Sequence, residues 1–346
     1  MPWQWISRIL NRASSEDSQQ DNKPEVNNSS TPPIHNASLA GHEESTIQAA
    51  QALESGFFCW LLDCNAAELE VNSDRLRQKV QTILKALDQG AFSVDQLPRR
   101  PASFPLLIKL LNSDNASNID IANTLLSDPA LATQTLKTAN SPFFRSSHET
   151  IDTVERAVFI LGSLGIRNIV SATVMMPMIK SNNSKEGILS KKIWEWGLLS
   201  AAASDQYSYH QGDSSSPIYL LGLLPALTYL LIYRALQACR ETDDTLGEIE
   251  ACVVKSVIQQ RSWQLCHSIC QQWGLPPSSN KYLLDAERPS PSESATPLRD
   301  GILIGTHKVL QVESNSPIDD KAAFSLIGAS NRINKIVVHF LDGKIK

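Results

Sequence analysis

Apolar residues recur along most of the chain at the three- and four-residue spacing that is typical of amphipathic helices. Two such stretches lie within residues 43–90, one around Trp60 and one around Ile83. After them the same spacing predicts further helices in close succession. These helices cover residues 104–111, 119–126, 129–139, 153–161, 191–207, 218–239, 246–260, 263–273 and 298–310.

Strict alternation of apolar and polar residues, the mark of a half-buried strand, is not sustained for long in this sequence. Residues 335–341 are the ambiguous stretch, because their apolar side chains suit either a strand or the end of a helix. The pattern therefore predicts an all-α protein built as a multi-helix bundle.

Local signals predict where several helices begin and end. Asp128 followed by Pro129 is typical of an N-cap with proline at the first helical position, and Asn140 with Pro142 would end that helix. Gly162, together with a second glycine three residues later, predicts a corner after the next helix.

Polar and proline-rich segments divide the chain into four expected parts. They are an amphipathic tip with a disordered linker (1–42), a helical extension (43–94), the main helical domain (95–297) and a C-terminal helical extension (298–346). Three prolines between residues 97 and 105 exclude a continuous helix there, so we place the main boundary at this point.

The first twelve residues combine apolar Trp3, Ile6 and Leu10 with Arg8 and Arg12. Such a piece could contact a membrane surface peripherally or bind a partner. The alternative is a frayed terminus, because twelve residues are marginal for an isolated helix.

The longest uncharged stretch, residues 218–233, also has to be considered as a membrane span. It is shorter than the 18 or so residues that a span usually needs, and Pro225 and Thr228 interrupt it. We therefore expect a buried core helix and no transmembrane segment.

Composition and charge narrow the function classes. The formal net charge of -5 argues against a nucleic-acid binder, which usually carries a basic face, so no nucleic-acid partner is expected. The start of the chain lacks a basic region followed by an apolar stretch, so we expect a cytoplasmic protein with six reduced cysteines.

A hydrolytic metal site needs several His and carboxylate side chains that converge on one cavity. The seven histidines do not pair with one another at helical spacing, and the nearest approach to a ligand pair is His210 with Asp213, which a polar loop explains as well. Cys266 and Cys270 flank His267 but lack the paired spacing of a structural zinc site, so small core residues are favoured. No metal, cofactor or catalytic residue is predicted.

Several short motifs follow one another along the chain. They are Leu97-Pro98, Leu126 to Leu131, Ala139-Asn140-Ser141, Gly162 with Arg167-Asn168, Trp194, Gly222-Leu223-Leu224 and Trp273-Gly274-Leu275-Pro276. In order and spacing they resemble the motifs of the HDOD domain family, whose members are bacterial signalling modules related to the HD superfamily of metal-dependent phosphohydrolases. The resemblance covers roughly residues 97–297 and implies an HD-like helical bundle.

The resemblance also implies where the metal ligands of the superfamily would stand in this chain. Apart from one glutamate, the residues at those positions cannot bind a hard or borderline divalent metal. The positions are Trp196, Pro225, Ala226, Ser262, Ala286 and Glu287.

The loop after residue 140 carries Phe143, Phe144 and Arg145. One interpretation is that both rings fold back and cover the bundle. The other is a partner-binding contact, because aromatic residues and arginine are enriched in protein interfaces. The Arg99-Arg100 pair could hold an anion, although exposed arginines in a loop are usually only solvated.

The resemblance and the absent ligands together predict a non-catalytic HDOD-like signalling or scaffold module that binds signalling proteins in bacterial signal transduction. One alternative is a residual metal-dependent phosphohydrolase of the HD superfamily. The other is a binder of a nucleotide second messenger, for which the sequence supplies neither a phosphate loop nor a clear arginine cluster.

Overall fold

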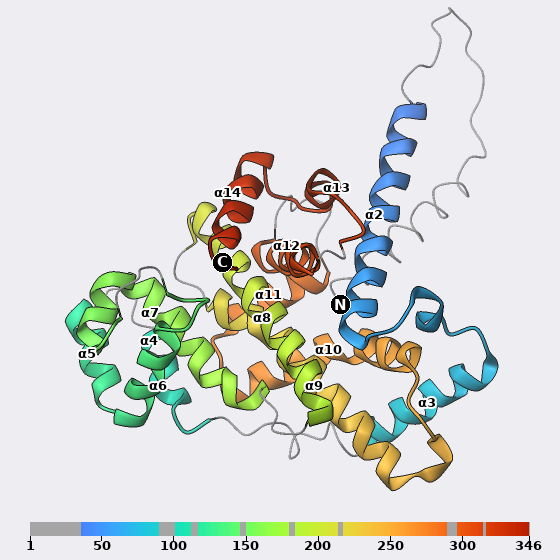
Figure 1. Ribbon diagram of the computed structural model, residues 1–346, viewed down its shortest axis with the longest axis horizontal. Helices are drawn as coiled ribbons and strands as arrows, with labels where there is room; N and C mark the ends of the chain where they lie inside the picture. Colours follow the sequence, from blue (N-terminus) through green and yellow to red (C-terminus); the bar gives the residue numbers. More distant parts are fainter. Residues whose placement is uncertain are drawn as a thin grey trace, which may run out of the picture.

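The computed structural model describes residues 36–89, 101–111, 117–145, 150–179, 184–213, 217–288, 296–313 and 316–345. All regular elements in these ranges are helical, which confirms the predicted all-α class. Figure 1 shows them in chain order. They are α2 (Asn36–Leu62), η2 (Ala66–Leu69), α3 (Asp74–Gln89), α4 (Phe104–Leu111), α5 (Asn118–Leu126), α6 (Pro129–Ala139), α7 (Val154–Ile179), α8 (Ser184–His210), α9 (Ile218–Thr242), η4 (Asp244–Leu246), α10 (Ala251–Trp273), α11 (Pro277–Glu287), α12 (Pro297–Val312), α13 (Asp320–Ser325) and α14 (Asn331–Asp342).

The helix-end signals act as the sequence predicts. Asp128 caps α6, since its side chain accepts a hydrogen bond from the backbone N–H of Leu131 at 3.0 Å. Asn140 follows the end of α6 and bonds both ways with Ile151, donating to its carbonyl at 2.7 Å and accepting from its N–H at 2.8 Å. This one side chain therefore ties the end of α6 to the segment that leads into α7.

Helices α4, α5 and α6 and the first part of α7 gather in one lobe, on the left in Figure 1. Gly162 has a φ of 69°, a left-handed conformation inside α7 that bends the helix at the predicted corner. The rest of α7 then runs toward α8 and α9. The bend allows one helix to serve two parts of the molecule.

Helix α8 lies at the centre of the fold, packed between α9 and α12 (Figure 1). On the α9 side, a Cβ atom added at Gly222 would lie 2.6 Å from Cα of Ala201, and one added at Gly197 would lie 2.7 Å from Cβ of Ala226. Such distances are shorter than real contacts, so the two backbones approach as closely as only glycine permits.

The α12 side of α8 is packed in the same way. A Cβ at Gly301 would lie 2.5 Å from Cα of Ser204, and one at Gly305 would lie 2.7 Å from Cα of Ser200. Helix α12 therefore belongs to the central core, although it falls within the expected C-terminal extension. The four expected parts of the chain remain predictions.

Several elements differ in extent from the expectation, and helix α7 continues to Ile179, well beyond the predicted end at 161. The two helices predicted at 246–260 and 263–273 are one helix, α10, because the residues between them include neither glycine nor proline. Arg261 at the expected break forms a two-pronged ion pair with Asp88 of α3. Residues 335–341 belong to helix α14. Helix α2 begins at Asn36, inside the expected linker, where Ala37 and Ala40 have a high helix propensity.

The uncharged stretch at 218–233 forms most of α9 and is buried, as predicted. By length and composition alone, α7 and α9 are the described helices that could cross a membrane, with 56% and 83% of their most apolar windows buried. A core helix meets the same criterion, so this is weak evidence for a membrane span.

The glycine contacts of α12 give a direct stability test. Replacing Gly301 with Ala forces the added methyl group into the backbone at Ser204, so the free energy of unfolding should fall by about 3 kcal/mol. The control is Gly187→Ala in α8, where nothing lies within 4 Å and the better helix former should add about 0.5 to 1 kcal/mol. Urea unfolding measures both, and equal effects would contradict the central role of this contact.

Candidate functional site

Trp196 stands where the resemblance places the first histidine of the superfamily, and it is fully packed. Its indole N–H donates to the hydroxyl of Thr306 on α12 at 2.9 Å. Its ring lies 4.8 Å from that of Phe57 and 4.9 Å from that of Tyr229, measured between centroids. The position is therefore part of an aromatic cluster that joins α2, α8, α9 and α12.

Pro225 and Ala226 stand at the expected His-Asp pair, and both are buried in α9. Ala226 packs directly on Gly197 of α8. One turn on, the hydroxyl of Thr228 donates to the carbonyl of Pro225 at 3.0 Å and lies 3.8 Å from the sulfur of Cys266. Apolar contacts and backbone bonds therefore fill the region where ligands would converge.

Ser262 and Ala286 are buried as well, which leaves Glu287 as the one acidic side chain among these positions. A Glu287 oxygen lies 3.5 Å from Nε2 of His267, and this contact holds the pKa of Glu287 below its ordinary value. Its other oxygen lies 3.6 Å from Nε of Arg288. The Glu287 carboxylate thus contacts two basic side chains, those of His267 and Arg288.

The other candidate ligands do not converge either. Burial raises the pKa of the Cys266 thiol to about 12 and also raises that of Cys270, so both pack in the core as neutral thiols in the absence of a metal. The ring of His210 packs edge-on against Tyr209, whereas the Asp213 carboxylate accepts a hydrogen bond from Tyr282. Within the described ranges, no three His, Cys, Asp or Glu side chains form a group that could hold a metal ion.

The loop with the two phenylalanines corrects one expectation. Phe144 is only 7% exposed, so its ring covers the core and does not face a partner. Phe143 is half-buried, meets Phe144 edge-on at 5.1 Å and has the Lys344 ammonium 5.9 Å from its ring. Arg145 is exposed. The binding role of this loop remains a prediction that now rests on Phe143 and Arg145.

Large apolar side chains lie exposed on the neighbouring lobe, and the sequence analysis did not single them out. Phe159 of α7 is 83% exposed and Ile119 of α5 is 72% exposed. The signal was present, because the expected inward face of α7, through Val154, Ala157 and Val158, leaves Phe159 on the opposite side.

A buried carboxylate in α8 was also missed. Asp205 accepts a hydrogen bond from the side-chain amide of Asn168 in α7 at 3.0 Å. Burial raises the pKa of Asp205 to about 6, and the hydroxyl of Tyr219, also buried, has no hydrogen-bond partner among the described residues. Asn168 belongs to the Arg167-Asn168 motif, so this motif helps to hold α7 against α8.

Some sequence predictions lie outside the described residues. These are the tip at 1–12 with most of the linker, the Leu97-Pro98 motif and the Arg99-Arg100 pair.

Comparison with protein families matches the HDOD domain to residues 97–289, more than half of the chain. The chain therefore belongs to the HDOD domain family, as its motifs suggested. A search of curated proteins found no match.

Solved structures with the same fold include an HDOD domain protein of unknown function from Geobacter sulfurreducens, with 16% identity and a TM-score of 0.52, covering 78% of this chain and 95% of that one. A candidate phosphohydrolase from Shewanella amazonensis SB2B has 18% identity and a TM-score of 0.52, covering 80% and 97%. A candidate metal-dependent phosphohydrolase from the same organism has 16% identity and a TM-score of 0.51, covering 79% and 100%. At these identities the likeness establishes the fold.

The burial of Phe144 predicts a structural effect of its removal. Phe144→Ala should lower the free energy of unfolding by about 3 to 5 kcal/mol, because it leaves a cavity in the core. Lys137→Ala, the control at an exposed position of α6, should leave it within about 0.5 kcal/mol. Thermal unfolding distinguishes the two variants. A negligible effect of Phe144→Ala would contradict the burial of its ring.

Asp205 predicts a pH-dependent effect on stability. Its pKa is raised in the folded chain, so the neutral carboxyl contributes stability that is present below about pH 4 and lost as the pH rises through about 6. Asp205→Asn cannot ionise and should be more stable than wild type by about 2 kcal/mol at about pH 8, with little difference at about pH 4. The control is Asp74→Asn at an exposed site, and a gain at the higher pH no larger than at the lower one would contradict the assignment.

Proposed function

We propose that this chain is a non-catalytic HDOD module that binds protein partners in cytoplasmic signal transduction in bacteria. The observation that carries the proposal is the packing at the positions of the superfamily's ligands. Trp196 bonds to α12, and Ala226 lies against Gly197 where α8 and α9 are in backbone contact.

This packing is unfavourable for hydrolysis on physical grounds. A catalytic metal needs convergent charged or imidazole ligands and an open coordination position for water. Here aromatic and aliphatic side chains fill the space between helices, and Glu287, the one carboxylate among the aligned positions, lies 3.5 Å from Nε2 of His267. A metal bound in this region would have to displace core contacts.

The exposed apolar side chains support a binding role. Isolated hydrophobic residues are common on surfaces, but a phenylalanine that is 83% exposed on the same lobe as an exposed isoleucine is typical of an interaction surface. Phe159 and Ile119 lie on α7 and α5, two helices that pack together. We expect a partner to cover this lobe.

The enzyme alternative is decided by elemental analysis and a phosphodiester hydrolysis assay on the purified chain. We expect neither stoichiometric metal nor metal-dependent hydrolysis. Stoichiometric manganese, iron or zinc, together with hydrolysis that His210→Ala or Asp213→Ala abolishes, would overturn the proposal.

The binding role is tested at Phe159. A partner is first identified by affinity capture from the native cell and then purified. Phe159→Ser should weaken its binding at least about tenfold, because the exposed ring would be buried only in the complex, whereas thermal stability should hardly change. The matched control is Ile188→Ser, another largely exposed apolar residue on α8, and the same loss in both variants would contradict a specific surface.

A further inference from the structure

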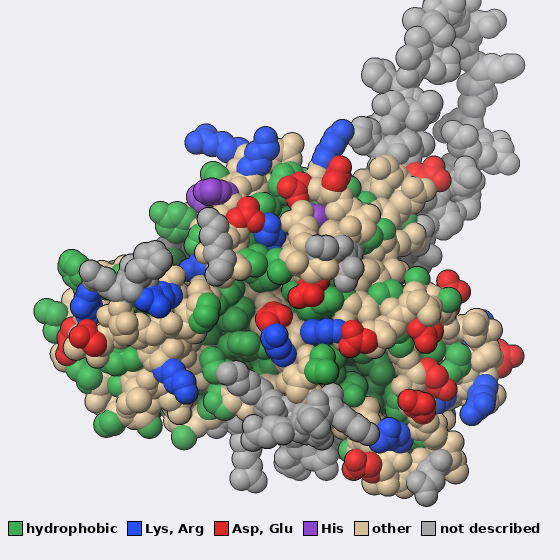
Figure 2. Space-filling view, in the orientation of Figure 1, with side chains coloured by type: hydrophobic (Ala, Val, Ile, Leu, Met, Phe, Trp, Pro, Cys, Tyr) green, Lys and Arg blue, Asp and Glu red, His purple; other side chains and the backbone are tan. Residues whose placement is uncertain are grey.

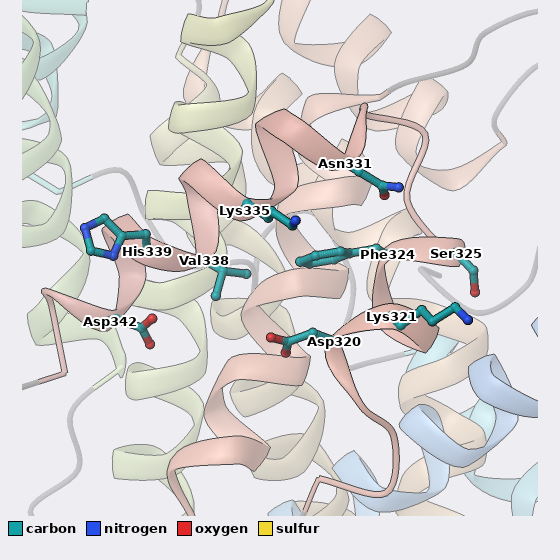
Figure 3. Close-up of a pocket in the computed structure, with 9 residues that line it drawn as sticks. All are labelled: Asp320, Lys321, Phe324, Ser325, Asn331, Lys335, Val338, His339 and Asp342. Carbon is teal, nitrogen blue, oxygen red and sulfur yellow. The ribbon is translucent and has the colours of Figure 1, made fainter.

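A groove of about 620 Å³ opens between α13 and α14, outside the matched residues 97–289 (Figure 3). Phe324 and Val338, both half-buried, supply its apolar part and face the space between the two helices. Lys321, Lys335 and His339 line its rim. The groove thus combines an apolar floor with a cationic edge, the composition of a small protein-binding site.

The helices that form the groove are fixed to the core, so its shape is preorganised. The Tyr207 hydroxyl of α8 donates to the side-chain oxygen of buried Asn334 in α14 at 3.0 Å. Asp300 of α12 accepts hydrogen bonds from the backbone N–H groups of Gly328 and Ala329, at 3.1 and 3.2 Å, in the turn that leads into α14. A rigid groove loses little freedom when it binds a ligand.

Two carboxylates line the groove, and both contact side chains of α12. Asp342 forms an ion pair with Lys308 of α12. Asp320 accepts a hydrogen bond from the Gln311 amide at 2.7 Å and lies 2.8 Å from Nε2 of His307. The Lys308 ammonium offsets the charge of Asp342, so this acid opposes an incoming anion less than a free carboxylate would. Asp320 is held in place by hydrogen bonds, but burial lowers the pKa of His307, so the charge of Asp320 is not offset in the same way.

The cations of the rim are not paired in this way. Lys321, Lys335 and the adjacent Arg332 are exposed, and none of the three forms an ion pair with another described residue. In Figure 2, blue side chains gather at the top of the molecule, where Figure 1 places α13 and α14. The lining also includes Asp320 and Asp342, so the cationic character of this surface comes from the exposed rim.

We propose that the groove binds an acidic amphipathic segment of a partner protein. An apolar side chain of that segment packs on Phe324 and Val338, and its Asp or Glu side chains pair with Lys321, Lys335 and Arg332. This inference rests on the proposed protein-binding function and names the chemistry of the partner.

A protein segment fits the groove better than an anionic lipid surface does. A membrane is flat, whereas the apolar floor lies between two helices. A segment with a protruding side chain can reach this floor. The tip at residues 1–12 is a poor occupant, because Arg8 and Arg12 would meet the cationic rim.

The test uses the full chain and two fluorescein-labelled designed helical peptides with the same leucine face. One peptide has glutamate at its polar positions and the other has lysine. By fluorescence anisotropy the glutamate peptide should bind, more weakly as salt rises, and the lysine peptide should not. Binding of both peptides, or of neither, would overturn the inference.

Variants then locate the binding site. The double variant Lys321→Glu with Lys335→Glu should weaken the glutamate peptide at least about tenfold. The control, Lys85→Glu with Lys281→Glu on α3 and α11, makes the same change in net charge at exposed sites elsewhere and should weaken it less than about twofold. Ser325→Trp, an exposed position in the groove wall, should block the floor without lowering thermal stability.

Other outcomes are equally decisive. Equal losses in the rim and control variants would show a general charge effect and overturn the groove. Tighter binding to phosphatidylserine vesicles than to the peptide, lost in the rim variant, would replace the protein partner with a membrane. If an identified native partner binds the rim variant and the wild type equally, the proposed role of the groove is wrong, whereas the proposed protein-binding function stands. Metal-dependent hydrolysis with normal peptide binding would overturn only the proposed function.

Discussion

The fold depends on the contact of α8 with two helices at distances that leave no room for a Cβ atom. Gly197 and Gly222 allow this approach on the α9 side, and Gly301 and Gly305 allow it on the α12 side. Close backbone contact of this kind is highly sensitive to side-chain size, because packed interiors have few voids. The positions of α7, α10 and α14 follow from these two contacts, since these helices pack on the ones that make them.

Much of this architecture could be predicted locally. Helix positions follow from apolar spacing, and the ends of α6 follow from Asp128 and Asn140, whose bonds involve near neighbours. The break expected within α10 was wrong, because Arg261 and Ser262 include neither glycine nor proline and the helix continues through them. The ion pair of Arg261 with Asp88 joins residues far apart in the sequence, and such a contact leaves no local signal.

The candidate site was predictable in composition but not in geometry. The sequence already contains no His-Asp pair, so poor ligands at Pro225 and Ala226 could be named in advance. The burial of Phe144 depends on how the loop after α6 folds over the bundle. The groove depends on α13 and α14 being held against α12, which the separate patterns of these short segments do not encode.

The contact between Ala226 and Gly197 also limits what this chain can become. A metal ligand at position 226 would need a side chain larger than alanine, and the α8 backbone occupies the space for it. A single substitution there would strain the two central helices before it bound anything. Any larger residue at this point would require the two helices to move apart, so the contact leaves this part of the chain little freedom to vary.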